Sequence, residues 1–177
     1  MGKEARGEFD NKGFFDYARK TLWNKSWAYW RYTREISEKV FGNDSIENIA
    51  FSNLIKCNDR KSGSNSFDNA NKDIKDNCLR EERVAFEEVR IIKPNIIVLY
   101  TNTYYDEYIT GDNCLFDSFE FISSTTKNVG KRKMPWMEGI GHISGLEDIR
   151  VLRVGHPQCK KKIAFVDLVS IWIKKEK

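Results

Sequence analysis

Prolines, histidines and cysteines are scarce in this chain of 177 residues, which holds three, two and four of them. The cysteines Cys57, Cys78, Cys114 and Cys159 lie far apart, and no pair has the Cys-x-x-Cys spacing of redox or zinc motifs. No apolar run reaches the roughly 18 residues that a membrane helix needs, and the chain does not open on a secretory signal. We therefore expect a cytoplasmic protein with reduced thiols and no membrane contact.

Several familiar catalytic signatures are also missing. The chain shows no Ser-His-Asp order, no phosphate-binding P-loop and no zinc-ligand spacing. The Gly-x-Gly at residues 139–141 lacks the third glycine and the preceding strand that a dinucleotide site requires. These absences leave the strand ends and the charged runs as the places to look for function.

The charge balance is mildly basic, with 30 lysines and arginines against 26 acidic residues, a net charge of +4. Such a balance permits nucleic-acid binding without predicting it, because binding depends on how the charges cluster. Three runs concentrate positive charge, at residues 131–133, 160–162 and 174–175. A single run more often belongs to a solvated face, but 160–162 directly follows His156-Pro157 and carries more weight.

The length fits one folded domain. Residues 1–13 are charged and glycine-rich without periodicity, which predicts a flexible arm, and residues 14–177 form the single domain. The apolar pattern predicts two helices within 14–40 with a break near 24–26, followed by helices at 77–92 and 160–174. Residues 58–77 and 127–145 are polar or glycine-rich and predict loops.

Short apolar runs predict three buried strands, at residues 48–52, 95–101 and 149–154. Residues 115–123 alternate more weakly and predict a strand or hairpin arm. The run at 95–101 is continuously apolar, which is typical of a parallel strand covered on both faces. Asn53 and His156 follow the first and the last of these runs. Because the carboxyl ends of parallel strands open onto one crevice, these two side chains are predicted to face the same ligand.

Between residues 27 and 159 this pattern resembles the uracil-DNA glycosylase superfamily. The Asn53–Cys57 segment is similar to the strand whose Asn reads a pyrimidine, and residues 87–106 are similar to the helix and Pro-led strand that follow it. His156-Pro157 is similar to the His-Pro of the loop that intercalates into DNA. The resemblance implies a three-layer α/β/α sandwich with a short, mostly parallel central sheet.

The resemblance also implies roles for single residues. Asn53 pairs with the Watson-Crick edge of a flipped base, and Trp30 stacks on that base. His156, the catalytic residue, donates to the base carbonyl and stabilises the negative charge that develops there. Each also has a plain structural interpretation, as a turn Asn, a helix core residue and a loop histidine.

The phosphate contacts depart from the family pattern. Gln158 stands where the family has a serine that contacts the DNA phosphate backbone. Further candidates for phosphate contacts follow it, namely Lys160, Lys161 and Lys162. The implied partner is DNA, with single or double strand left open.

One catalytic part is missing before Trp27. Active relatives carry a Gly-rich motif there whose Asp, Asn or Glu positions the attacking water, and this chain has none. Either the chain is an amino-terminally shortened relative or it has lost the chemistry. Asp106 is a conceivable replacement carboxylate, although a helix cap or turn is the favoured interpretation. We expect base recognition with little or no excision; the alternative is a non-enzymatic protein-interaction domain.

Some relatives hold a four-iron cluster, and the spacing of Cys57 and Cys78 is similar to one of its cysteine pairs. The other pair has no counterpart here, and a cluster needs its full set of thiolates. We therefore expect no metal and no cofactor.

Overall fold

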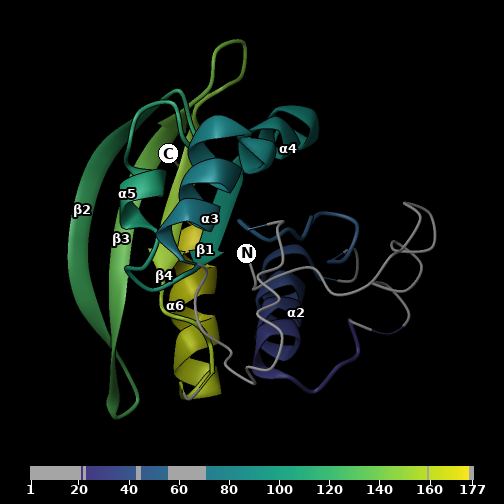
Figure 1. Cartoon of the computed structure of the whole chain (residues 1–177). Helices are drawn as coiled ribbons and strands as arrows, with labels where there is room; N and C mark the ends of the chain where they lie inside the picture. Colours follow the sequence, from purple (N-terminus) through teal and green to yellow (C-terminus); the bar gives the residue numbers. More distant parts are fainter. Residues whose placement is uncertain (1–20, 22, 43–44, 56–70, 159, 176–177) are drawn as a thin grey trace, which may run out of the picture.

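The computed structural model describes residues 21, 23–42, 45–55, 71–158 and 160–175, and they form an α/β fold (Figure 1). Four strands make one mixed sheet in the order β1-β4-β3-β2. The strands are β1 (Ile96–Tyr100), β2 (Ser118–Val129), β3 (Arg132–His142) and β4 (Ile149–Val154). β1 and β4 pair in parallel, whereas β3 pairs antiparallel with both β4 and β2.

The expected three-layer sandwich around a mostly parallel sheet is therefore wrong. Residues 127–145, expected as a loop, contain the end of β2 and all of β3. Val129 pairs with Arg132 across the two-residue turn that Gly130 opens with φ +65°, and so short a connection forces antiparallel pairing. Pro135 is tolerated in β3 because it lies beyond the segment that pairs with β4, which starts at Trp136.

The helices in the described residues are α2 (Ala28–Phe41), α3 (Lys72–Asp76), the π-helical turn η3 (Asn77–Glu81), α4 (Val84–Ile92), α5 (Asp106–Ile109) and α6 (Lys162–Lys174). None of these helices is both long and apolar enough to cross a membrane. The helix expected at 77–92 is broken at Arg83, which adopts the left-handed conformation, and it ends as expected before Pro94. Part of the expected 58–77 loop is helical in α3.

Two expectations concern the amino-terminal third. The strand expected at 48–52 does not form, and Asn53 makes only an isolated β-bridge. The expected arm at 1–13, the helix before residue 21 and most of the 58–77 loop lie outside the described residues.

Apolar clusters pack on both faces of the sheet. α3, η3, α4 and α5 cover one face over Leu99 and Val151, and the segment with Leu54 and Ile55 joins the same cluster. α2 and α6 lie side by side on the other face (Figure 1), over Leu152 and Val154. Because side chains alternate along a strand, Arg153 points to the α5 face while its two neighbours point to the α6 face.

Asp117, just before β2, binds residues from two other segments, the one before α4 and the one after β3. Its carboxylate accepts from the N–H of Ser144 at 2.8 Å and from Arg83 Nη2 at 3.3 Å. The Ser144 hydrogen bond lowers the pKa of Asp117 below its usual value, and Arg83 adds to this shift. The ionised carboxylate therefore stabilises the fold above the unfolded-state pKa, and this contribution is lost as the pH falls through the folded-state pKa.

We accordingly expect Asp117→Asn to reduce the acid sensitivity of the protein. The difference in unfolding free energy between pH 7 and pH 3, measured by urea denaturation, should be smaller in the variant than in the original chain. All other carboxyl groups titrate in both proteins and cancel in the comparison. An equal loss of stability on acidification in both would contradict the assignment.

Candidate functional site

The carboxyl ends of the parallel strands β1 and β4 lie side by side, because Tyr100 pairs with Val154. The chain leaves β1 through Asn102, whose N–H donates to the carbonyl of Val154 at 3.1 Å. It leaves β4 through Gly155 and His156. The structure thus creates a shared edge with polar residues from β1 and β4. The predicted edge between two parallel strands that end at Asn53 and His156 is wrong, because residues 48–52 form no strand.

Two side chains approach Gly155 closely at this edge. A Cβ on it would lie 2.9 Å from Asn102 Oδ1 and 3.1 Å from Met134 Cγ. Asn102 itself has a φ of +51°, a left-handed conformation that Asn tolerates better than most residues. The Asn102 amide therefore lies against the strand end that carries His156. Sequence reasoning missed Asn102, although its position directly after an apolar strand was the same signal that singled out Asn53.

The half-buried His156 has one ring nitrogen fixed by the backbone. The N–H of Gln158 donates to His156 Nδ1 at 3.2 Å. A ring nitrogen that accepts a hydrogen bond carries no proton, so the neutral imidazole holds its proton on Nε2. The loop geometry thus presets His156 as an N–H donor through Nε2, while the Gln158 side chain remains exposed.

Trp30 on α2 lies next to the Asn53 segment. Its ring packs edge-on against Phe51 at 4.8 Å and against Tyr29 at 5.0 Å between centroids. Tyr29 in turn packs against Tyr100 at 5.7 Å, so a chain of rings connects the Asn53 segment to the end of β1. Trp30 and Asn53 are both half-buried. The structure therefore brings these two candidates into one neighbourhood, beside the end of β1.

The three candidate lysines have different surroundings. Lys162 Nζ forms an ion pair with Glu35 on α2 at 2.6 Å, so its charge is neutralised within the protein. Lys160 Nζ donates to the backbone carbonyl of Lys133 at 3.1 Å and keeps its charge. Lys161 is exposed. Lys160 and Lys161 therefore remain available to an anionic partner, and Lys162 is held by Glu35.

Asp106 is the first residue of α5, but its side chain does not cap the helix. Its Oδ2 accepts from Arg153 Nη2 at 2.7 Å, and the Arg153 side chain is only 2% exposed. Among the described residues, Arg153 Nε and Nη1 and Asp106 Oδ1 are buried without a hydrogen-bond partner. Burial raises the pKa of Asp106, and the guanidinium of Arg153 acts against that shift. The expectation of a cap or turn residue thus missed this ion pair, which positions the carboxylate against Arg153.

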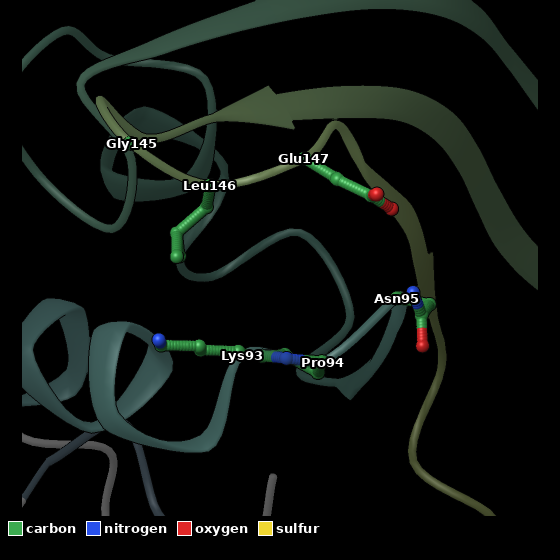
Figure 2. A pocket seen from close by; sticks show the side chains of 6 residues that line it. All are labelled: Lys93, Pro94, Asn95, Gly145, Leu146 and Glu147. Atoms are coloured by element: carbon green, nitrogen blue, oxygen red, sulfur yellow. The ribbon is translucent and has the colours of Figure 1, made fainter.

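The described residues also contain an open pocket of about 300 Å³, which lies away from the candidate edge. Lys93, Pro94 and Asn95 line it just before β1, and Gly145, Leu146 and Glu147 line it before β4. Figure 2 shows the side chains of Lys93 and Glu147 pointing toward opposite sides of this pocket. Its position at the amino ends of the parallel strands separates it from His156.

The cysteines give no sign of a cluster within the described part of the chain. Cys78 and Cys114 are both buried, and burial raises the pKa of the Cys114 thiol. The described residues hold no group of three or more His, Cys, Asp or Glu side chains arranged for a metal ion. Cys57 and Cys159 lie outside the described residues, so the expected absence of an iron-sulfur cluster stays a prediction.

Comparison with protein-family models, with curated proteins and with solved structures gives no match for this chain. The resemblance to the uracil-DNA glycosylase superfamily therefore stays a prediction from the sequence.

Proposed function

We propose that this chain binds nucleic acid and holds a flipped base beside the carboxyl ends of β1 and β4. The observation that carries the proposal is the position of His156 directly after β4, where its Nδ1 accepts from the N–H of Gln158. A neutral N–H donor at this edge suits a base carbonyl and the negative charge that a departing base develops. The Asn102 amide at Gly155 adds a second donor and acceptor at the same edge.

Asn53 and Trp30 supply the remaining contacts of the proposal. An Asn side chain both donates and accepts, so Asn53 suits the Watson-Crick edge of a pyrimidine. Trp30 offers a ring in the neighbourhood of Asn53, and stacking on an aromatic side chain contributes about 1–3 kcal/mol per base. The aromatic contacts of Trp30 with Phe51 and Tyr29 hold it in position for that role.

The proposal is one of recognition rather than robust hydrolysis. Excision needs a carboxylate or amide that orients water at the glycosidic bond, and geometry decides which group qualifies. Asp106, the conceivable replacement, is engaged by Arg153. A cytoplasmic location is part of the same proposal, and the free thiol of Cys114 fits a reducing compartment.

Binding to base-modified DNA tests the proposal. We expect a duplex with one uracil or one abasic site to bind more tightly than the matched unmodified duplex in fluorescence anisotropy at low salt. His156→Ala and Asn53→Ala should each remove this preference without a change in melting temperature. His142→Ala is the matched control, because His142 ends β3 beside Asp148, near the amino end of β4 and away from the candidate edge.

The same oligonucleotides test excision through the appearance of alkali-labile sites. We expect this chain to produce few or no alkali-labile sites. Turnover that His156→Ala abolishes would overturn this expectation and make the chain a working glycosylase. Equal affinity for modified and unmodified duplexes in every variant would refute base recognition, and no binding at low salt would favour the protein-interaction alternative.

A further inference from the structure

Two basic runs that are about thirty residues apart in the sequence meet at the end of the β2–β3 hairpin. Lys160 Nζ donates to the carbonyl of Lys133 at 3.1 Å. At Gly130, which opens the turn, an added Cβ would lie 2.8 Å from the Cβ of Lys161. Figure 1 shows the turn between β2 and β3 at the same end of the molecule as the start of α6. The turn and the segment before α6 therefore form one surface.

We call this surface the basic ridge; it consists of Lys131, Arg132, Lys133, Lys160 and Lys161. All of them except the half-buried Lys160 are exposed. Across the described residues, none of the five forms an ion pair with a carboxylate, in contrast to Lys162 with Glu35. Five cations held together without a neutralising acid repel one another, and an anionic partner would relieve that repulsion.

The position of the ridge is fixed by a third element. The hydroxyl of Tyr32 on α2 donates to the carbonyl of Lys160 at 2.8 Å. Tyr32 is buried against Phe165 of α6, with ring centroids 5.5 Å apart. Lys160, which belongs to the ridge, follows His156 by four residues in the sequence. A polyanion on the ridge would thus lie beside the edge that carries the proposed base site.

The residue types on the ridge indicate which nucleic acid it suits. Surfaces that bind single strands combine cations with aromatic side chains on which bases stack. Neither residues 130–134 nor residues 157–162 include an aromatic side chain, and His156 belongs to the proposed base site. Cations without stacking partners contact phosphates and leave bases paired, which is the mode of binding to a duplex backbone.

We propose that the basic ridge binds the phosphate backbone of double-stranded DNA next to the flipped nucleotide. This inference rests on the proposed function for the identity of the polymer, and it adds the strand state and the contact surface. The long β2–β3 hairpin then serves as an arm that fixes the duplex while the strand ends of β1 and β4 read one base.

The test uses the full chain with Lys131, Arg132 and Lys133 all replaced by Gln. Glutamine keeps the backbone carbonyl of residue 133 that accepts from Lys160, so the turn stays intact. We expect the variant to bind unmodified duplex at least tenfold more weakly at low salt. The slope of log affinity against log salt should flatten by up to about three units, roughly one for each lost phosphate contact. The original chain should prefer duplex to single strand of the same sequence.

A control variant loses positive charge at a site away from the ridge. Lys174→Gln with Lys175→Gln removes two positive charges at the opposite end of α6 and should change neither affinity nor slope appreciably. Circular dichroism melting of all variants would confirm that the fold is retained.

Two outcomes separate this inference from the proposed function. If the triple variant loses duplex affinity while the original chain shows no preference for uracil, the ridge is confirmed and base recognition fails. If the preference for uracil persists but the triple variant binds with unchanged affinity and slope, the ridge is refuted. A preference for single strands would also refute it, and so would binding to phosphatidylserine vesicles without binding to duplex.

Discussion

Asp106→Ala is expected to lower the free energy of unfolding by about 3 kcal/mol, because it leaves the guanidinium of Arg153 buried without a counter-charge. Arg153 is 2% exposed and its Nη2 donates to Asp106 at 2.7 Å. Breaking a buried ion pair typically costs about 3–5 kcal/mol, and the lower end applies here because the Asp106 side chain is about one-third exposed.

The partner substitution should behave differently. Arg153→Met replaces the buried charge with an apolar side chain of similar length, so the need for a counter-charge disappears along with it. We expect a loss of less than about 1.5 kcal/mol. Adding Asp106→Ala to Arg153→Met should then cost much less than Asp106→Ala alone. Urea unfolding of the three variants measures these differences. Equal losses from the two single variants, with an additive double variant, would show that the pair is not coupled.

The second large effect is expected from Gly141→Ala, with a loss of about 2 kcal/mol. A Cβ at residue 141 would lie 2.4 Å from two ring atoms of Phe116. Phe116 is fully buried and cannot move aside without displacing the core, so the added methyl group overpacks it. Overpacking of this kind typically costs about 1–3 kcal/mol. The alanine also lowers the conformational entropy of the unfolded chain, which offsets about 0.4–1 kcal/mol of this loss of stability.

A double-mutant cycle with Phe116→Leu tests the cause. The smaller leucine gives room to the added Cβ, so the double variant should be more stable than the sum of the two single losses predicts. Thermal or urea unfolding of the four proteins is the measurement. Additive losses would mean that the ring of Phe116 is not what excludes a side chain at residue 141.

The strands β1 and β4 could be predicted from the sequence, but the edge that they share could not, because the predicted neighbour of the His156 strand was the segment before Asn53. Residues 95–101 and 149–154 are apolar runs bounded by a proline and by polar residues, and they became β1 and β4 nearly as predicted. Burial on both faces needs no distant information, because a continuous apolar run is unfavourable anywhere else. The presence of polar side chains at the ends of both strands followed from the same pattern.

The strand β3 could not be predicted from the sequence, because it depends on tertiary contacts. Pro135, Gly139 and Gly141 give its sequence the composition of a loop. The rings of Phe119 and Phe116 lie over the two glycines and supply the packing that these residues lack. Those rings come from about twenty residues earlier, so no local pattern could reveal them.

The ion-pair partners of single charged residues could not be predicted from the sequence either. Arg153 belonged to an apolar strand without any sign that Asp106, 47 residues earlier, would face it. Lys162 and Lys161 are neighbours with the same charge, yet only Lys162 has an acid, Glu35, 127 residues away. Local propensities specify which elements form, whereas charge pairing depends on how those elements pack. The sequence therefore predicted the strand that ends before His156, and packing decided which strand lies beside it and which nearby cations among the described residues have no acidic partner.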